Sequence, residues 1–194
     1  MQLLHYFMVF LCAGLASCSL QKASRAAKPT AFLTNSVTDS TSSLSRLPFA
    51  HAWQAPSAEI SKYKHIVIRP VSTAYLPDQA GAKKSRKLAR QLYASLRREF
   101  SSPLCGFYLT DSTAKLGTLI LETALTETSD SGFVAFEARV RDADTSKIIA
   151  TVADRRETQT RSAREIGDEW SRQLMETTNK ELFPKVKRGA SSPF

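Results

Sequence analysis

The 194-residue chain is poor in cysteine and histidine, with three of each, and it contains only seven glycines. Its longest apolar run, from Leu3 to Ala16, is shorter than the roughly 20 residues that a helix needs to span a bilayer. No glycine-rich phosphate loop is present in the sequence. These absences argue against a membrane anchor made by this run alone and against a nucleotide-binding loop.

The N-terminal apolar run is followed by small residues, which is the pattern of a secretory signal peptide. No Lys or Arg precedes the run, so the charged start of such peptides is missing. At its end, Leu15-Ala16-Ser17-Cys18 resembles the lipobox of bacterial lipoproteins. The resemblance implies that residues 1–17 are removed and that the Cys18 thiol carries a covalent lipid. The alternatives are a plain signal peptide with an incidental cysteine and an uncleaved buried helix.

Acylation at Cys18 predicts a firmly anchored protein, because each buried CH₂ contributes about 0.8 kcal/mol and more than one acyl chain is attached. In lipoproteins of this type, a residue other than Asp after the cysteine permits export to the outer membrane, and this chain has Ser19. We therefore expect a lipid-anchored protein of the bacterial outer membrane that faces the periplasm. The lipid is the only bound group that we expect, without a metal or another cofactor. Cys105 then has no partner for an intramolecular disulfide.

The charge is strongly basic. All 27 Lys and Arg and all 18 Asp and Glu follow Cys18, so the exported chain keeps the net charge of +9. This balance predicts an acidic partner, either an anionic lipid surface or another envelope component. Nucleic acid is not expected as a partner of an exported protein.

The chain divides into four parts by composition. After the signal peptide at residues 1–17, residues 18–45 are rich in Ser, Thr, Ala and Lys and predict a lipidated flexible tether. Residues 46–184 form a single predicted α+β domain, and residues 185–194 form a polar C-terminal tail. At residues 46–56, aromatic and proline residues predict an irregular strap that packs on the domain; a partner-binding motif on the tether is the alternative.

Hydrophobic periodicity predicts the order β-α-β-β-β-β-α. A β-branched run at 63–71 is followed by an amphipathic helix over 80–100 and a short strand at 105–111. Three segments with strand character then form an antiparallel meander, and a second amphipathic helix covers 162–183. This order predicts a two-layer α+β sandwich, with a mostly antiparallel sheet and both helices on one face.

One face of the first predicted helix is basic, opposite its leucine stripe. The candidate residues for contact with an anionic surface are Lys83, Lys84, Lys87, Arg90, Arg97 and Arg98. The alternative is an ordinary solvated helix face. We expect the domain to dock other envelope components or an anionic surface through these residues.

Three stretches carry a family resemblance: AFL at 31–33, YKHIVIRPV at 63–71 and GFVAFEARVRDADTSKIIATVADRRE at 132–157. The chain resembles a family of bacterial lipoproteins known as domain of unknown function 3313. Glu137, Asp142, Thr145 and Asp154 stand where that family tends to carry Glu, Asp, Thr and Asp. Ser146 departs from the pattern, because the family usually has Gly there. The resemblance implies an envelope location and this fold, without an established activity.

Candidates for catalysis are few. Cys105 needs a nearby base to form a thiolate, and His51 and His65 carry no motif. The paired carboxylates Glu122 and Glu137 are interpreted as members of an exposed, charged sheet surface.

The sequence DADTSK lacks the Gly and Glu of a calcium loop, so its aspartates are interpreted as caps of turn amides. We therefore expect no enzyme and no metal. The alternative is a small-ligand carrier or envelope enzyme with a pocket between sheet and helices.

Overall fold

The computed structural model describes residues 30–34, 47–55, 62–76, 82–113, 116–128 and 132–183. Six strands form one sheet in the order β1-β6-β5-β4-β2-β3. The strands are β1 (His51–Gln54), β2 (His65–Ile68), β3 (Tyr108–Leu109), β4 (Thr118–Glu127), β5 (Phe133–Asp142) and β6 (Ile148–Glu157). The neighbouring pairs β1-β6, β6-β5 and β5-β4 are antiparallel, whereas β2 is parallel to both β4 and β3.

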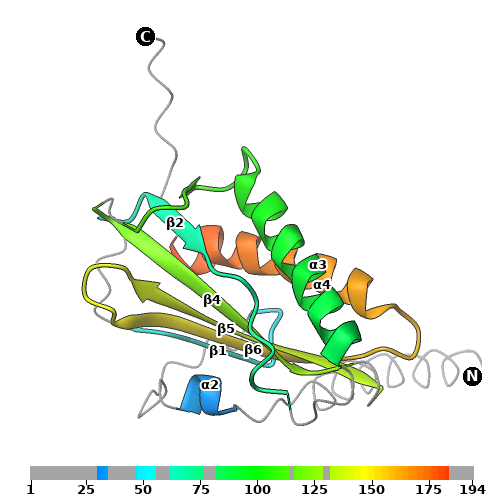
Figure 1. The fold of residues 1–194 in the computed structure, drawn as a ribbon. Helices are drawn as coiled ribbons and strands as arrows, with labels where there is room; N and C mark the ends of the chain where they lie inside the picture. The colour runs from blue at the N-terminus through cyan, green and yellow to red at the C-terminus, as the bar shows by residue number, and fades with distance from the viewer. Residues whose placement is uncertain are drawn as a thin grey trace, which may run out of the picture.

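Two long helices cover one face of this sheet, and one short helix lies on the opposite face (Figure 1). The helix face carries α3 (Ala82–Ser101) and α4 (Ala163–Thr177), and α4 continues as the π-helical turn η3 (Thr178–Leu182). The opposite face, called the α2 face below, carries α2 (Ala31–Thr34). The predicted α+β sandwich with two helices on one face is confirmed.

The predicted order of elements is wrong at its start, where α2 and β1 precede the first predicted strand. Residues 46–56, expected to be an irregular strap, contain β1, which pairs with β6 from His51↔Ala153 to Gln54↔Ala150. A strand of four residues is too short to show alternation. Its pairing partner lies far along the chain, so the tertiary structure alone selects this strand.

Part of the predicted tether is also packed. Phe32 and Leu33 of α2 are 3% and 0% exposed, in a cluster with Ala124 of β4 and Ala153 of β6. The tether prediction is therefore wrong for residues 30–34. Two apolar residues in a polar stretch give no helical period, yet burying such side chains contributes about 1.5–3 kcal/mol each.

Several predictions concern residues outside the described part of the chain. They are the signal peptide at 1–17, the lipid attachment at Cys18, and the polar tail at 185–194. They stay predictions from the sequence.

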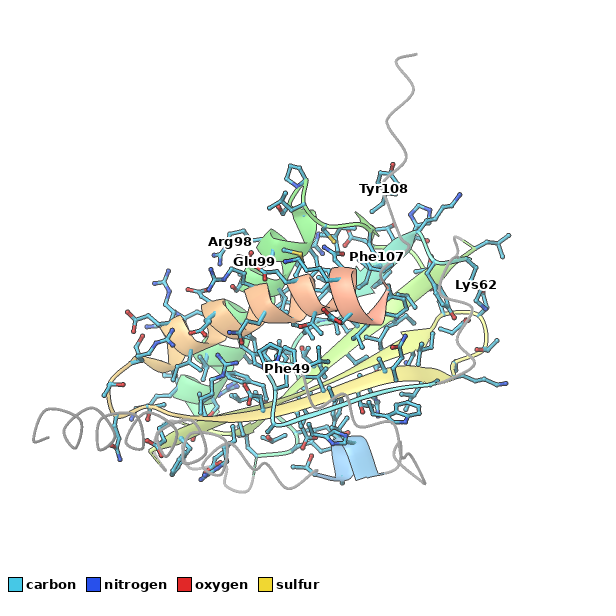
Figure 2. The ribbon with its side chains drawn as sticks, turned by 180° about the vertical axis from the view of Figure 1, so that it is seen from behind. Phe49, Lys62, Arg98, Glu99, Phe107 and Tyr108 are labelled. Carbon is cyan, nitrogen blue, oxygen red and sulfur yellow. The ribbon has the colours of Figure 1, made fainter. Side chains whose placement is uncertain are left out.

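The core fills the space between the helices and the sheet. The predicted stripe of α3 is buried against the sheet, with Leu92, Leu96 and Phe100 at most 1% exposed. Trp170 of α4 is fully buried and stacks on Phe136 of β5, with 5.0 Å between the ring centroids. Phe49 meets Trp170 edge-on and lies between helix and sheet (Figure 2). The expected packing of this aromatic residue onto the domain is confirmed.

The hairpin between β5 and β6 holds a non-glycine residue in the left-handed region. Ser146 has a φ of 59°, and its amide donates to the carbonyl oxygen of Asp142 at 2.9 Å. A side chain there crowds the backbone, whereas glycine adopts this conformation without that cost. The turn therefore has the geometry that favours glycine, although the chain carries serine.

We expect Ser146→Gly to raise the free energy of unfolding by about 0.5–1 kcal/mol, because relief of strain exceeds the added entropy of the unfolded chain. Thr145→Gly is the matched control and should lower it, since Thr145 has no positive φ and its hydroxyl accepts a hydrogen bond from the Lys147 amide. Urea unfolding of the three proteins measures both values. Equal destabilisation by the two changes would contradict the assignment.

Candidate functional site

The N-terminal half of α3 concentrates positive charge. Its five basic side chains, called the basic half of α3 below, are all exposed: Lys83, Lys84, Arg86, Lys87 and Arg90. No acidic residue lies in the first turn, and Glu99 near the other end is the only carboxylate of the helix. Arg86 is not among the residues predicted from the sequence, and the structure adds it to this face because its side chain is exposed.

This charge arrangement opposes the stability of the helix. The N-terminus of a helix carries a positive partial charge, and a cation there costs roughly 0.3–1 kcal/mol at low salt. Lys83 and Lys87 are four residues apart, as are Arg86 and Arg90, and like charges at this spacing repel each other. The sequence of α3 therefore places its positive charge where it lowers the stability of the helix.

The two remaining candidates, Arg97 and Arg98, are engaged within the domain. Arg97 donates to the Asp111 carboxylate at 2.7 Å, and this hydrogen bond raises the pKa of the guanidinium. Arg98 forms ion pairs with the carboxylates of Glu99 at 3.0 Å and Asp168 at 3.3 Å, and it lies beside Glu99 on α3 in Figure 2. Of the predicted six, Arg97 and Arg98 therefore pair with acids of the domain, and the other four lie near the start of the helix.

Two shallow hollows flank the basic half of α3. The larger, of about 450 Å³, is bounded by α3, the end of β4 and the start of α4. Its lining includes Lys84, Lys87, Gln91, Thr128, Ser162 and Arg164. The smaller, of about 160 Å³, is lined by Pro70, Val71, Thr73, Arg86, Ala89, Arg90 and Tyr93. Arg164 lies far from α3 in sequence, so only the fold could add it to this surface.

The nucleophile and base candidates take part in the packing of the domain. Cys105 is 1% exposed, and its sulfur lies 3.9 Å from the Asn179 side-chain oxygen. His65 packs against the ring of Tyr108. Burial lowers the pKa of His51, with a smaller opposing effect from Glu137, so that its imidazole is neutral at neutral pH. The interpretation of Cys105 as a small buried side chain is confirmed.

Asp142 holds the hairpin and a neighbouring segment. One carboxylate oxygen accepts hydrogen bonds from the amides of Asp144 and Thr145, at 2.8 and 3.0 Å. The other accepts from the Tyr63 hydroxyl at 2.7 Å and pairs with Lys62 at 3.1 Å. Burial raises the pKa of Asp142, but these hydrogen bonds lower it by more, so it lies well below its ordinary value. The predicted cap of the turn amides is confirmed.

The two glutamates of the sheet do not form an exposed pair. Glu122 binds Arg139 at 2.6 Å and Arg141 at 2.7 Å. Glu137 is 1% exposed and accepts hydrogen bonds from the backbone and the hydroxyl of Thr30. The prediction of an exposed, charged sheet surface is wrong at this position, because α2 covers the sheet there.

Asp154 also holds a peripheral segment on the sheet, here on the helix face. It is fully buried, accepts from the Ala50 amide at 3.3 Å and pairs with Arg156 at 2.6 Å. Arg156 also donates to Gln173 of α4. Glu137, Asp142 and Asp154 therefore each fasten a different peripheral segment to the sheet.

The described residues were compared with the patterns of a metal site and of a membrane-spanning helix. Within these ranges, no group of three or more His, Cys, Asp or Glu side chains is placed to hold a metal ion. None of the described helices is both long and apolar enough to cross a membrane.

The sequence matches a known family over more than half its length. Residues 28–132 match the family described as protein of unknown function (DUF3313). The chain belongs to the DUF3313 family. The match begins just before Thr30 and ends before β5, so it includes α2, α3 and β4. The resemblance that the sequence suggested is confirmed, and the DUF3313 match covers the basic half of α3.

Two solved structures share distant similarity with this DUF3313 chain. A PelC dodecamer from Paraburkholderia phytofirmans is 12% identical, covering 71% of this chain and 98% of that chain, with a TM-score of 0.41. Lipoprotein GNA1162 from Neisseria meningitidis is 14% identical, covering 60% and 98%, with a TM-score of 0.39. A search of curated proteins gives no match to the chain.

Proposed function

We infer that this DUF3313 protein is a non-catalytic bacterial envelope lipoprotein that docks an acidic component through the basic half of α3. Acylated Cys18 is its anchor, and its location is the outer membrane, facing the periplasm. The sequence from Leu15 to Cys18 supports the anchor, and Ser19 supports the outer membrane.

The observation that carries the docking proposal is the position of the charge. Five exposed cations gather at the end of α3 where they oppose the helix dipole and one another. An acidic surface would relieve both effects, and each Lys or Arg near such a surface contributes about 1 kcal/mol before salt screening. The cations that destabilise α3 in the unbound domain therefore attract the acidic surface in a complex.

Docking has more support than the alternative of a small-ligand carrier or envelope enzyme. That alternative requires a pocket between the sheet and the helices. Trp170, stacked on Phe136 and in contact with Phe49, fills the centre of this interface. The hollows described above lie instead beside α3.

Reversing two charges with Lys83→Glu and Lys87→Glu should weaken binding to anionic vesicles and to immobilised poly-L-glutamate at least about tenfold at low salt. The free energy of unfolding should stay the same or rise by about 0.5–1 kcal/mol, because repulsion within α3 is removed. Co-sedimentation and thermal unfolding of the non-lipidated chain from residue 19 measure the two effects.

The matched control reverses Lys64, just before β2, and Arg172 of α4, which are both exposed and lie outside α3. This control variant has the same net charge as the α3 variant, so a loss of binding caused by net charge alone would appear in both. If the control loses as much binding as the α3 variant, the basic half of α3 is not the docking surface.

A further inference from the structure

The α2 segment is fastened to the sheet at several points. We call Thr30 to Leu33 the clip. The Thr30 amide donates to one carboxylate oxygen of Glu137 at 2.7 Å, and its hydroxyl donates to the other at 2.8 Å. Arg139 donates to the Phe32 carbonyl oxygen at 3.0 Å, and Leu33 is fully buried. Polar contacts and apolar burial together hold the clip on the sheet.

The clip limits the distance between the domain and its predicted anchor. Eleven residues separate Cys18 from Thr30. Whatever its conformation, a segment of this length spans at most about 40 Å. While the clip is bound, it therefore lies within about 40 Å of the bilayer that holds the lipid on Cys18.

The segment after β2 connects the clip with the smaller hollow beside α3. Tyr75 packs edge-on against Phe32 of the clip, with 5.2 Å between the ring centroids. Thr73 lines the smaller hollow together with Arg86 and Arg90. Two residues of chain span at most about 7 Å. The hollow that holds these two arginines therefore lies close to the clip.

Strand β4 connects the clip with the larger hollow. Ala124 of β4 packs in one cluster with the apolar side chains of the clip. Thr128, four residues later and thus at most about 14 Å away, lines the larger hollow together with Lys84 and Lys87. In Figure 1 the start of α3 lies beside the end of β4. By both connections, the basic half of α3 lies near the point from which the chain leads to Cys18.

This position decides which acidic surface the basic half of α3 meets. Electrostatic attraction to a membrane falls off within a Debye length, about 8 Å at physiological salt, so the cations must stay close to the surface that they bind. A short link to the lipid keeps them at a high effective concentration beside that surface. The bilayer that holds the anchor is therefore always within reach of the basic half of α3.

We propose that the basic half of α3 lies on the anionic headgroups of the bilayer that carries the protein's own lipid, and that the clip keeps it within reach. This inference rests on the proposed function and on the lipid at Cys18, and it names the acidic component as lipid. The larger hollow fits a headgroup, because Lys84, Lys87 and Arg164 line it and a phosphate accepts hydrogen bonds from such cations.

The other end of α3 then points away from the bilayer. Leu104, just beyond that end, is 82% exposed. A helix of 20 residues is about 30 Å long, so its two ends differ in depth by far more than a Debye length when the start lies on the headgroups. The proposal therefore predicts one orientation of the domain.

Lipid-attached nitroxide quenchers test this orientation in full-length lipidated protein on vesicles that contain anionic lipid. Fluorophores are placed by Ala74→Cys, an exposed position between the clip and the smaller hollow, or by Leu104→Cys, in a Cys105→Ala background. We expect the fluorophore at position 74 to be quenched several-fold more strongly than that at position 104. Equal or stronger quenching at position 104 would overturn the proposed orientation.

Charge reversal tests whether the cations cause the orientation. Lys83→Glu with Lys87→Glu should remove most of the difference in quenching between positions 74 and 104, as should vesicles of neutral lipid. The matched control with Lys64 and Arg172 reversed has the same net charge and should keep the difference. If both variants lose it equally, net charge and not the basic half of α3 sets the orientation, which contradicts the proposal.

Release of the clip tests its part in the proposal. Phe32→Ser with Leu33→Ser removes the buried contacts, and the next described residue, Leu47, lies 29 positions after Cys18. The effective concentration of the cations at the bilayer falls with the longer link, so the difference in quenching should disappear at a lower salt concentration. Ala31→Ser changes an exposed position of the same segment and should keep the native salt dependence. The same salt dependence in all three proteins would show that the clip does not set the reach.

Poly-L-glutamate separates this inference from the proposed function. The non-lipidated chain should bind immobilised poly-L-glutamate through Lys83 and Lys87, without any bilayer. If it does so but the anchored protein shows equal quenching at positions 74 and 104, the inference is wrong and the proposed docking surface stands, with an acidic protein surface as its partner. If neither poly-L-glutamate binding nor quenching depends on Lys83 and Lys87, the proposed function itself fails.

Discussion

Replacing Cys18 by alanine should abolish incorporation of labelled palmitate and leave a precursor that still carries residues 1–17. The thiol is the only group to which the predicted diacylglyceryl chain attaches, and cleavage before residue 18 follows that modification in lipoproteins of the kind that this sequence resembles. Without acyl chains, the exported form loses the contribution of about 0.8 kcal/mol per buried CH₂ that holds the domain on a bilayer. Metabolic labelling and intact mass measurement detect both changes.

Cys12→Ala is the matched control, because Cys12 lies within the predicted signal peptide and has no predicted lipid. It should leave palmitate labelling and the mass of the mature protein unchanged. A native product that keeps its initiator methionine and carries no fatty acid would contradict the anchor. The proposed location depends on this result more than on any feature of the folded domain.

Asp142→Ala should lower the free energy of unfolding by about 3 kcal/mol at pH 7, because hydrogen bonds to a buried charged group contribute about 1.5–3 kcal/mol and their donors lose a partner. The affected donors are the amides of Asp144 and Thr145, the Tyr63 hydroxyl and Lys62. Urea unfolding measures the change. Most of the loss should come from the hairpin and the segment before β2, which this one carboxylate joins.

The effect of Asp142→Ala should depend on pH. The pKa of Asp142 in the folded protein lies well below its ordinary value, and in the unfolded chain it is about 3.9. A carboxylate with a lowered folded pKa stabilises fully above the unfolded pKa and loses this contribution as pH falls toward the folded pKa. The difference between the two proteins should therefore be constant above about pH 5 and shrink by roughly 1.4 kcal/mol per unit below about pH 4.

Asp144→Ala is the control for this series. Asp144 lies on the same turn, but its side chain is exposed, so its loss should change the free energy of unfolding by less than about 0.5 kcal/mol. A pH-independent difference for Asp142→Ala, or equal effects of the two substitutions, would contradict the role assigned to the buried carboxylate.

The fold could largely be predicted because its main elements carry local periods. The α3 stripe from Leu88 to Phe100 repeats every three or four residues, and the alternating residues of β5 share one face. By contrast, β1 is only four residues long, and α2 has two large apolar residues in a polar stretch. These short elements exist because distant strands provide their partners.

The lipobox-like boundary at Cys18, the excess of positive charge and the helix that carries much of it can all be predicted from the sequence alone. Those features depend on neighbouring residues. Only the tertiary structure brings Arg97 to Asp111 and Arg98 to Asp168. It also brings Thr30 to Glu137, 107 positions away in the sequence, where the Glu137 carboxylate accepts its hydrogen bonds. Contacts across such a distance leave no period in the sequence, because they arise only when the folded sheet brings the segments together.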